Sequence, residues 1–446
     1  MNNQTDESRQ RAHFTLIVLF AINTLNFFDR QILAAVNEPI RQQWNLGDGA
    51  MGMISTAFTL IYAFVGVPLG RWADRGERTR ILSIGVAVWS LFTAASGMAW
   101  SYASLFLARI GVGIGEAACA PTANSIIGDL YPPGKRARAI SVFMLGLPVG
   151  IFLSYWLTGL IVVRVTPLVG AANAWKVPFF IATIPGLILS FLALRLVEPK
   201  RGASDNYSTQ HLTATNSPWR RLLTIPTLWW IIISGALHNF NAYAVNHFLP
   251  AYLGRYHGLG LGQANTISAI VLGAVGMIGL LGGGILADRV QHRSRRGRML
   301  LGSFAVILMV PCIAAAIQLP PGAILPFILL TGAGWTCFYA YYVTVYPTIQ
   351  DVVEPNLRAT AMAIYFFARY ILGGAFGTTV VGFLSDHYAR KAMLASGAQV
   401  LTEAHRASGL HDAFLIVPVV ATILSLVLLA GSFTVRRDMA KMTGEA

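Results

Sequence analysis

The sequence of 446 residues contains few charged residues, which make up 12% of the chain, and only three cysteines. Hydrophobic residues make up 55%, which is far more apolar surface than a soluble domain of this length needs. The composition therefore excludes a chain built mainly of soluble domains. The cysteines all fall inside apolar runs, so we expect neither a disulfide framework nor a cysteine metal site.

Sequence motifs for enzyme chemistry are also missing. The sequence shows no nucleotide-binding loop, no nucleophile triad and no set of metal ligands, so we expect neither an enzyme nor a bound cofactor or metal. A membrane enzyme or sensor is the least favoured of the hypotheses that we weighed.

The net charge of +14 is explained by the membrane. Lys and Arg concentrate in alternate loops, as in proteins that keep their basic loops inside the cell. We therefore expect cytoplasmic N- and C-termini, contact of the basic loops with the lipid bilayer, and no binding of nucleic acid. This places the chain in a plasma membrane as a multi-pass protein, and we expect the inner membrane of a bacterium.

About twelve apolar runs are long enough to cross the hydrocarbon as helices, which needs about 20 residues each. The runs are continuous and do not alternate apolar with polar residues, so a membrane barrel is excluded. The predicted spans are 14–36, 50–71, 80–99, 102–129, 136–164, 176–197, 227–252, 262–289, 298–318, 323–350, 357–385 and 411–435.

A repeated hexapeptide divides these spans into two halves. Gly70-Arg71-Trp72-Ala73-Asp74-Arg75 recurs as Gly284-Ile285-Leu286-Ala287-Asp288-Arg289, each time after the second span of its half. We therefore predict an all-α integral membrane protein, with twelve transmembrane helices in two pseudo-symmetric six-helix bundles. The predicted bundles are 1–197 and 226–446, joined by a polar cytoplasmic linker at 198–225. The outer segment at about 386–411 is the only other sizeable loop that we expect.

These features resemble the major facilitator superfamily over essentially the whole chain. The fourth span adds the arginine and glycine signature Arg109-Ile110-Gly111-Val112-Gly113-Ile114-Gly115-Glu116. With Asn26-Phe27-Phe28-Asp29-Arg30-Gln31 on the first span, the chain looks most like the Spinster branch, whose members move lysophospholipids and sphingosine phosphate. The resemblance implies that spans one, four, seven and ten line a central cavity.

The repeated motif predicts a gate. An Asp-Arg pair at a cytoplasmic helix end can hold neighbouring helix ends together in one conformation and release them in another, and glycine permits close helix approach. The alternative is a simple topological anchor. The gating residues that we predict are Gly70, Asp74, Arg75, Gly284, Asp288 and Arg289.

Ionisable residues deep in the spans are the candidates for chemistry, because burying them in the membrane is costly. At 1.5 Å per residue, Asp29 and Arg30 on the first span lie at the same level as Arg109 on the fourth. Glu116 lies two helical turns from Arg109 on the same face. We predict Glu116 as the principal proton site, with Asp29 as its partner or alternative. The competing interpretation is a fixed ion pair between Asp29 and either arginine.

Other side chains are candidates for binding substrate. Arg30 and Arg109 can bind phosphate or carboxylate through a planar fork, and Asn26 lies one turn from Arg30. Arg369 either faces the cavity or braces the bundle. The tenth span carries an aromatic stripe, and the seventh is unusually polar; for both, helix packing is the alternative to a cavity wall. These spans contribute Trp335, Tyr339, Tyr342 and Tyr346, and His238 and Asn239.

Two functions remain open within this fold. The first is a proton-coupled secondary transporter that carries an anionic amphiphile, such as a lysophospholipid or a sphingoid phosphate, by alternating access. The alternative is a transporter of a small organic anion or sugar acid. In both, protons are the expected coupling ion, and we expect the chain to act as a monomer.

Overall fold

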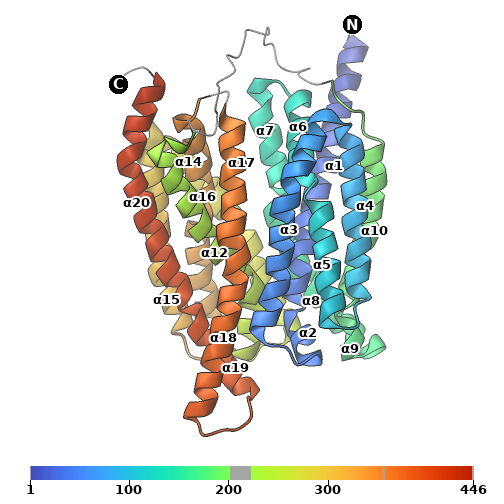
Figure 1. Ribbon diagram of the computed structural model, residues 1–446, viewed down its shortest axis with the longest axis vertical. Coiled ribbons are helices and arrows are strands. Elements are labelled where there is room, and N and C mark those ends of the chain that lie inside the picture. Colours follow the sequence, from blue (N-terminus) through green and yellow to red (C-terminus); the bar gives the residue numbers. More distant parts are fainter. Residues whose placement is uncertain (1, 201–221, 355–356, 444–446) are drawn as a thin grey trace. The chain divides into compact units, whose positions relative to one another are not determined.

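Helices make up all the regular structure in the described residues, which are 2–200, 222–354 and 357–443 of the computed structural model (Figure 1). The chain divides into two compact units. The first unit comprises Met1–Leu46 and Ala57–Gln210, and the second comprises Gly47–Thr56 and His211–Ala446. The first turns of one helix, α3, therefore belong to the second unit. Most of the predicted linker, at 201–221, lies outside the described residues, so its structure stays a prediction.

The first unit is built on long apolar helices. The helix α1 packs against α8 and α10, and α4 packs against α5 and α10 (Figure 1). The helices of this unit are α1 (Asn2–Ala35), α2 (Asn37–Gln43), α4 (Arg78–Gly97), α5 (Tyr102–Glu116), α6 (Cys119–Leu130), α7 (Pro133–Met144), α8 (Gly146–Val169), α9 (Ala171–Ala174) and α10 (Val177–Leu194), with most of α3 (Asp48–Arg75).

The second unit is organised in the same manner, with two π-helical segments, η1 and η3, inside its long helices. The helix α12 packs against η3 and α20, and α16 packs against α14 and α15. Its elements are α12 (Pro226–Arg255), α13 (Leu261–Ser268), η1 (Ala269–Ala274), α14 (Val275–Arg293), α15 (Gly297–Ile317), α16 (Ile324–Val352), α17 (Arg358–Ala368), η3 (Arg369–Gly374), α18 (Ala375–Ala395), α19 (Glu403–Phe414) and α20 (Ile416–Thr443).

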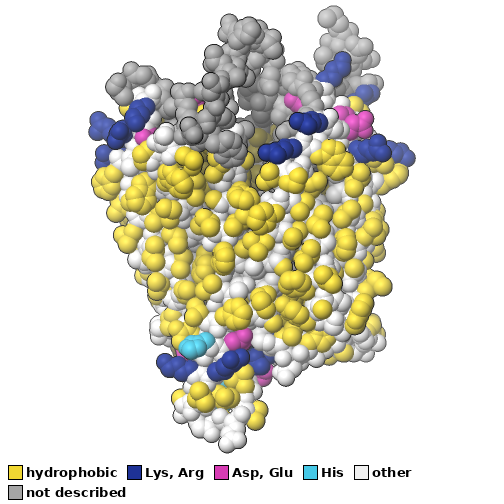
Figure 2. All heavy atoms as spheres, viewed as in Figure 1, with side chains coloured by type: hydrophobic (Ala, Val, Ile, Leu, Met, Phe, Trp, Pro, Cys, Tyr) yellow, Lys and Arg dark blue, Asp and Glu magenta, His cyan; other side chains and the backbone are white. Residues whose placement is uncertain are grey.

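Eleven helical stretches of the described residues are long and apolar enough to cross a membrane. The one predicted span that is not among them is 227–252, which is α12; it has 30 residues but buries polar side chains such as His238, Asn239 and Asn241. Figure 2 shows the expected surface: hydrophobic side chains cover the sides of the helices, and Lys and Arg gather near the helix ends. Each predicted span therefore coincides with a helix or with consecutive helices.

The predicted outer segment at 386–411 is largely helical. The helix α18 continues to Ala395, and α19 already begins at Glu403. The hydroxyl of Thr402 caps α19 by accepting a hydrogen bond from the backbone N–H of His405, which explains why a helix starts in this polar stretch. Only a short connection remains between the two helices.

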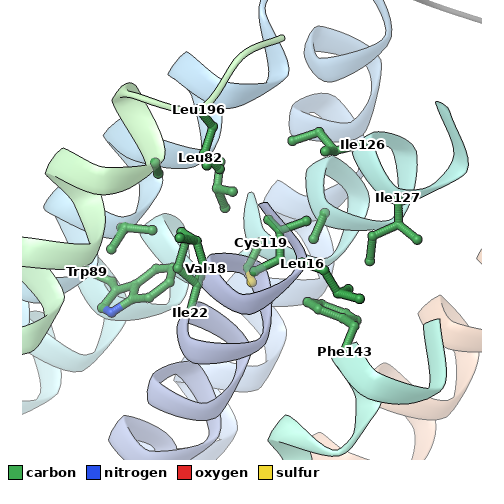
Figure 3. Close-up of a cluster of buried hydrophobic side chains, with 14 of the residues drawn as sticks. Leu16, Val18, Ile22, Leu82, Trp89, Cys119, Ile126, Ile127, Phe143 and Leu196 are labelled. Carbon is green, nitrogen blue, oxygen red and sulfur yellow. The ribbon is translucent and has the colours of Figure 1, made fainter. Parts of the chain in front are cut away.

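A core of aliphatic and aromatic side chains holds the first unit together. Figure 3 shows Val18 and Ile22 of α1 meeting Leu82 and Trp89 of α4, with Cys119 of α6 beside them. All five are buried. This core fixes α1 against α4 and α6, and so it determines which polar side chains of these helices face one another.

Glycines on α14 distinguish tight helix packing from open surface. A Cβ at Gly279 would lie 2.3 Å from the carbonyl oxygen of Thr336 on α16, and one at Gly276 would lie 2.7 Å from the ring of Tyr339. At Gly282 and Gly284 a Cβ would meet nothing within 4 Å. Close packing of glycines against another helix is therefore confined to one face of α14.

We expect Gly279→Ala to destabilise the protein by about 1–3 kcal/mol, because the added methyl group forces α14 away from α16. The matched variant Gly282→Ala should be neutral or slightly stabilising, because alanine favours the helix more than glycine does. Thermal unfolding of both variants in the same detergent measures the difference. Equal unfolding temperatures for the two variants would contradict this packing.

Candidate proton and substrate sites

Asp29 and Arg109 form a buried ion pair in the first unit. The Nη1 of Arg109 on α5 lies 2.9 Å from Oδ1 of Asp29 on α1, and its Nη2 donates to the backbone carbonyl of Asp29 at 3.2 Å. The hydroxyl of Thr93 on α4 donates to the other carboxylate oxygen. Both charged side chains are 2% exposed. The two residues meet as their predicted depths require, and both oxygens of Asp29 have a partner.

Glu116 pairs with the other arginine of the first unit. The Nε of Arg30 lies 2.6 Å from Oε2 of Glu116, whose side chain is fully buried. The second oxygen, Oε1, is buried without a hydrogen-bond partner in the described part of the chain. The guanidinium of Arg30 also lies over the rings of Phe27, Phe58 and Tyr62, at 5.1, 5.4 and 4.3 Å from their centroids.

An interruption of the fourth span accounts for the position of Glu116. The helix α5 ends at Glu116, and α6 begins three residues later at Cys119. Pro121 has no backbone N–H with which to continue the helical ladder to the carbonyl of Ala117, which weakens the helix at this point. The carboxyl group that we predicted as the proton site therefore stands at a break between two helices.

Asp29, Arg30, Arg109 and Glu116 thus form two neutral pairs and not a free cationic site. A buried carboxylate oxygen without a partner is costly when the group is ionised, and a proton on Glu116 would reduce that cost. Both carboxylate oxygens of Asp29 already have partners, so Asp29 and Glu116 differ in this respect. Asn26 is 3% exposed, and its Nδ2 has no partner among the described residues.

Arg369 forms a different kind of site in the second unit, because its contacts are neutral. Its Nη1 donates to the hydroxyl of Tyr346 at 2.5 Å, and its Nη2 donates to Oδ1 of Asn239 at 2.5 Å and to the hydroxyl of Tyr342 at 3.4 Å. The residue is 4% exposed. Within the described ranges, no Asp or Glu forms an ion pair with Arg369.

The remaining predicted binding residues of the second unit lie in helix packing. The ring of His238 stacks between Phe338 and Tyr341, with centroids 3.9 and 4.0 Å away, and the residue is fully buried. Tyr339 donates its hydroxyl to the carbonyl of Leu272 at 2.9 Å.

Trp335 lines a cavity of about 20 Å³. That volume is space for about one water molecule and not for a substrate. Of the aromatic stripe, Tyr342 and Tyr346 are the residues that contact Arg369, and both are partly exposed.

The predicted gating motif lies toward the ends of α3 and α14, but the ion pairs described near it are formed by other arginines. Arg75 and Arg289 are exposed, Gly70 and Gly284 are not tightly packed, and the side chain of Asp74 lies outside the described residues. Asp288 lies 3.6 Å from Arg298 at the start of α15 and is 74% exposed. The second copy of the motif therefore supplies its acidic residue to an arginine on the next helix.

Sequence reasoning missed the buried arginine of this region. Arg78 at the start of α4 is fully buried, and it forms ion pairs with Asp129 at the end of α6 and with Glu198, whose Oε1 is 2.6 Å from its Nε. In the second unit, Arg298 pairs in the same way with Asp351, at 2.6 Å. The repeat itself was only a partial signal, because Arg78 follows the first motif copy by three residues, whereas Arg298 follows the second copy by nine.

A second missed cluster holds the start of α3 within the second unit. Asp48 accepts two hydrogen bonds from the guanidinium of Arg255, at 2.7 and 2.8 Å, and one from Ser385 at 2.7 Å. The carboxylate of Asp386 caps α3 by accepting from the backbone N–H groups of Asp48 and Gly49, both at 2.9 Å. These residues lie at span ends, where we did not search for charge.

Comparison with known proteins identifies the family. The family model described as Major Facilitator Superfamily matches residues 19–378. The chain belongs to the major facilitator superfamily. The predicted resemblance and fold class are thereby confirmed, and the chain is a multi-pass membrane transporter and not an enzyme.

Several relatives within the superfamily resemble the chain over most of its length. An MFS-type efflux pump of Mycolicibacterium smegmatis is 29% identical over 379 residues, covering 84% of this chain and 85% of that protein. Protein spinster homolog 1 of Xenopus laevis is 28% identical over 400 residues, covering 86% and 74%. The hexuronate transporter of Bacillus subtilis is 27% identical over 391 residues, covering 83% and 87%.

A solved structure agrees with this placement in the superfamily. The crystal structure of a bacterial homolog to the human lysosomal transporter Spinster, in an inward-facing and unoccupied conformation, is 26% identical to this chain. The two superimpose with a TM-score of 0.86, covering 96% of this chain and 98% of that chain. The similarity to Spinster proteins that the first and fourth spans predict is therefore present in both sequence and structure.

For this major facilitator protein, we expect Arg109→Met to lower the free energy of unfolding by about 3–5 kcal/mol, because it leaves the buried carboxylate of Asp29 without its cation. The double variant Asp29→Leu with Arg109→Met removes both charges and should be more stable than Arg109→Met alone. Thermal unfolding in detergent tests this order. If the double variant instead unfolds at a lower temperature than Arg109→Met, the instability of Arg109→Met does not come from the unpaired carboxylate of Asp29.

Proposed function

We propose that the chain is a proton-coupled secondary transporter of an anionic amphiphile, with Glu116 as the proton site. The observation that carries the proposal is the pairing of the fully buried Glu116 with Arg30, with one carboxylate oxygen left without a partner among the described residues. A lysophospholipid or a related lipid is proposed as the substrate because the motifs of the first and fourth spans resemble the Spinster branch, to which relatives named spinster homolog also belong. Protons are the coupling ion in this proposal.

Coupling follows from the chemistry of the Arg30–Glu116 pair. A proton on Glu116 removes the negative charge beside Arg30, whose guanidinium cannot lose its own charge. The positive charge that remains in the first unit then favours the approach of an anionic substrate without binding it directly, and loss of the proton restores the original pair. Binding of proton and substrate would thus support each other, while Asp29 and Arg109 keep α1 and α5 together in both states.

The cellular setting of the proposal is the inner membrane of a bacterium, with both termini in the cytoplasm and a single chain as the transporting unit. The concentration of Lys and Arg in alternate loops supports this orientation. The alternative substrate class is a small organic anion or sugar acid, and the similarity to a hexuronate transporter supports it.

Glu116→Gln should abolish uphill transport driven by a pH gradient, because an amide does not take up or release a proton near neutral pH. The measurement is substrate accumulation by purified protein in liposomes with an imposed pH gradient. Glu403→Gln is the matched control, because the same change is made at an exposed position at the start of α19. Gradient-driven accumulation by Glu116→Gln at the rate of the control would rule out Glu116 as the proton site.

Proton flux also distinguishes the two substrate classes. We expect a lysophospholipid added to the proteoliposomes to start a proton flux that Glu116→Gln abolishes, while glucuronate at the same concentration starts none. The flux is recorded with a pH-sensitive dye inside the liposomes. If only glucuronate starts a proton flux, the substrate is a sugar acid and not an amphiphile, and the proposed coupling mechanism stands.

A further inference from the structure

Arg369 differs from the other deeply buried arginines of the candidate sites in what surrounds it. Arg30 and Arg109 each have a carboxylate within 2.9 Å, whereas the hydrogen-bond partners of Arg369 in the described chain are two tyrosine hydroxyls and the amide oxygen of Asn239. The Nε of Arg369 is buried with no partner among those residues. The second unit therefore holds a cation whose positive charge is not balanced by its described neighbours.

Aromatic rings surround the same guanidinium. Its central carbon lies between 5.4 and 5.9 Å from the ring centroids of Tyr342, Tyr365, Phe366 and Tyr370. Such rings attract a cation but supply far less than the charge of a carboxylate. A buried guanidinium held only by neutral groups is costly, and an anion from outside the protein would relieve that cost.

The backbone is shaped to place Arg369 against α12. Arg369 is the first residue of η3, and π-helical turns are rare and recur at functional sites. A Cβ at Gly373 would lie 2.1 Å from the carbonyl oxygen of Ala236 on α12, so only glycine permits this close approach. The approach brings Asn239 of α12 to Arg369, and the Nδ2 of Asn239 donates back to the carbonyl of Arg369 at 3.1 Å.

We propose that Arg369, with the hydroxyls of Tyr342 and Tyr346, binds a singly charged anionic group of the substrate, either a carboxylate or a phosphodiester. This inference rests on the proposed function, because it names the protein group that holds the anionic end of the transported molecule. Both tyrosines are partly exposed, so an anion can reach them, and each hydroxyl that accepts from Arg369 keeps its own proton to donate.

The single positive charge of the site favours a phosphodiester over a phosphate monoester. One guanidinium balances one negative charge, and its other described hydrogen-bonding partners are neutral. A phosphate monoester carries up to about two negative charges at neutral pH, so one would remain unbalanced in a buried site. A phosphodiester carries only one. The proposal therefore favours a lysophospholipid with a diester head over a sphingoid phosphate or another lipid monoester.

Equilibrium binding to the full-length protein in nanodiscs tests this proposal without any pH gradient. The probes are lysophosphatidylglycerol, lysophosphatidic acid and monoacylglycerol with the same acyl chain, together with glucuronate, all measured at pH 8. Wild-type protein should bind the diester more than about tenfold tighter than the neutral monoacylglycerol, and tighter than the monoester. In Arg369→Gln the diester and the neutral lipid should bind equally.

Three further variants make the result specific. Arg369→Lys keeps the charge but loses the planar fork, so it should retain only part of the preference for the diester. Tyr346→Phe keeps the cation and should reduce the preference, which covers the case in which Arg369→Gln does not fold. Arg390→Gln, at an exposed position on α18, should bind all probes as wild-type protein does.

The outcomes separate this inference from the proposed function. An unchanged preference for the diester in Arg369→Gln, or tighter binding of the monoester by wild-type protein, would overturn the role of Arg369 and leave the role of Glu116 standing. If wild-type protein binds neither lysolipid but binds glucuronate, and Arg369→Gln loses that binding, the anion site stands and the amphiphile is rejected. Because no gradient is applied, failure of proton coupling does not alter these results.

Discussion

The buried arginines impose the main constraint on this protein, because a guanidinium keeps its charge wherever the fold places it. In the first unit the constraint is met by carboxylates, so that Asp29 and Glu116 must face Arg109 and Arg30 across the α1–α5 contact. In the second unit Arg369 is met by hydroxyls, an amide oxygen and aromatic rings. The helix breaks, the close glycine contacts and the polar α12 all serve to bring these partners into place.

The sequence was sufficient to predict the fold and much of the first-unit site. Twelve apolar runs and a repeated motif predict two halves of six helices, because apolar length and internal repetition are properties of the sequence alone. Counting residues from the span ends also placed Asp29 at the level of Arg109. It did not predict that Arg30 would take Glu116, since the pairing depends on how α1 is rotated against α5 and on the break after Glu116.

The second-unit site was harder to predict, for a physical reason. A stripe of Trp and Tyr at helical spacing has the same sequence pattern whether it packs against other helices or lines a site. Only the positions of the neighbouring helices determine that Tyr339 packs against Leu272 while Tyr342 contacts Arg369. The π-helical turn at Arg369 shifts the register of the residues that follow it, which a helical periodicity of 3.6 does not anticipate. Likewise, Arg78 and Asp48 were missed because charges at span ends are common and become informative only when burial is known.

The single cation at Arg369 has an electrical consequence for a membrane with a voltage across it. If one proton loads Glu116 for each singly charged substrate that Arg369 binds, the proton and the anion cross together with no net charge. The membrane potential, which acts with about 2.3 kcal/mol per charge per 100 mV, then does no work on the completed cycle. Transport would follow the pH gradient and the substrate gradient alone, and it would continue unchanged in a cell whose membrane had been depolarised.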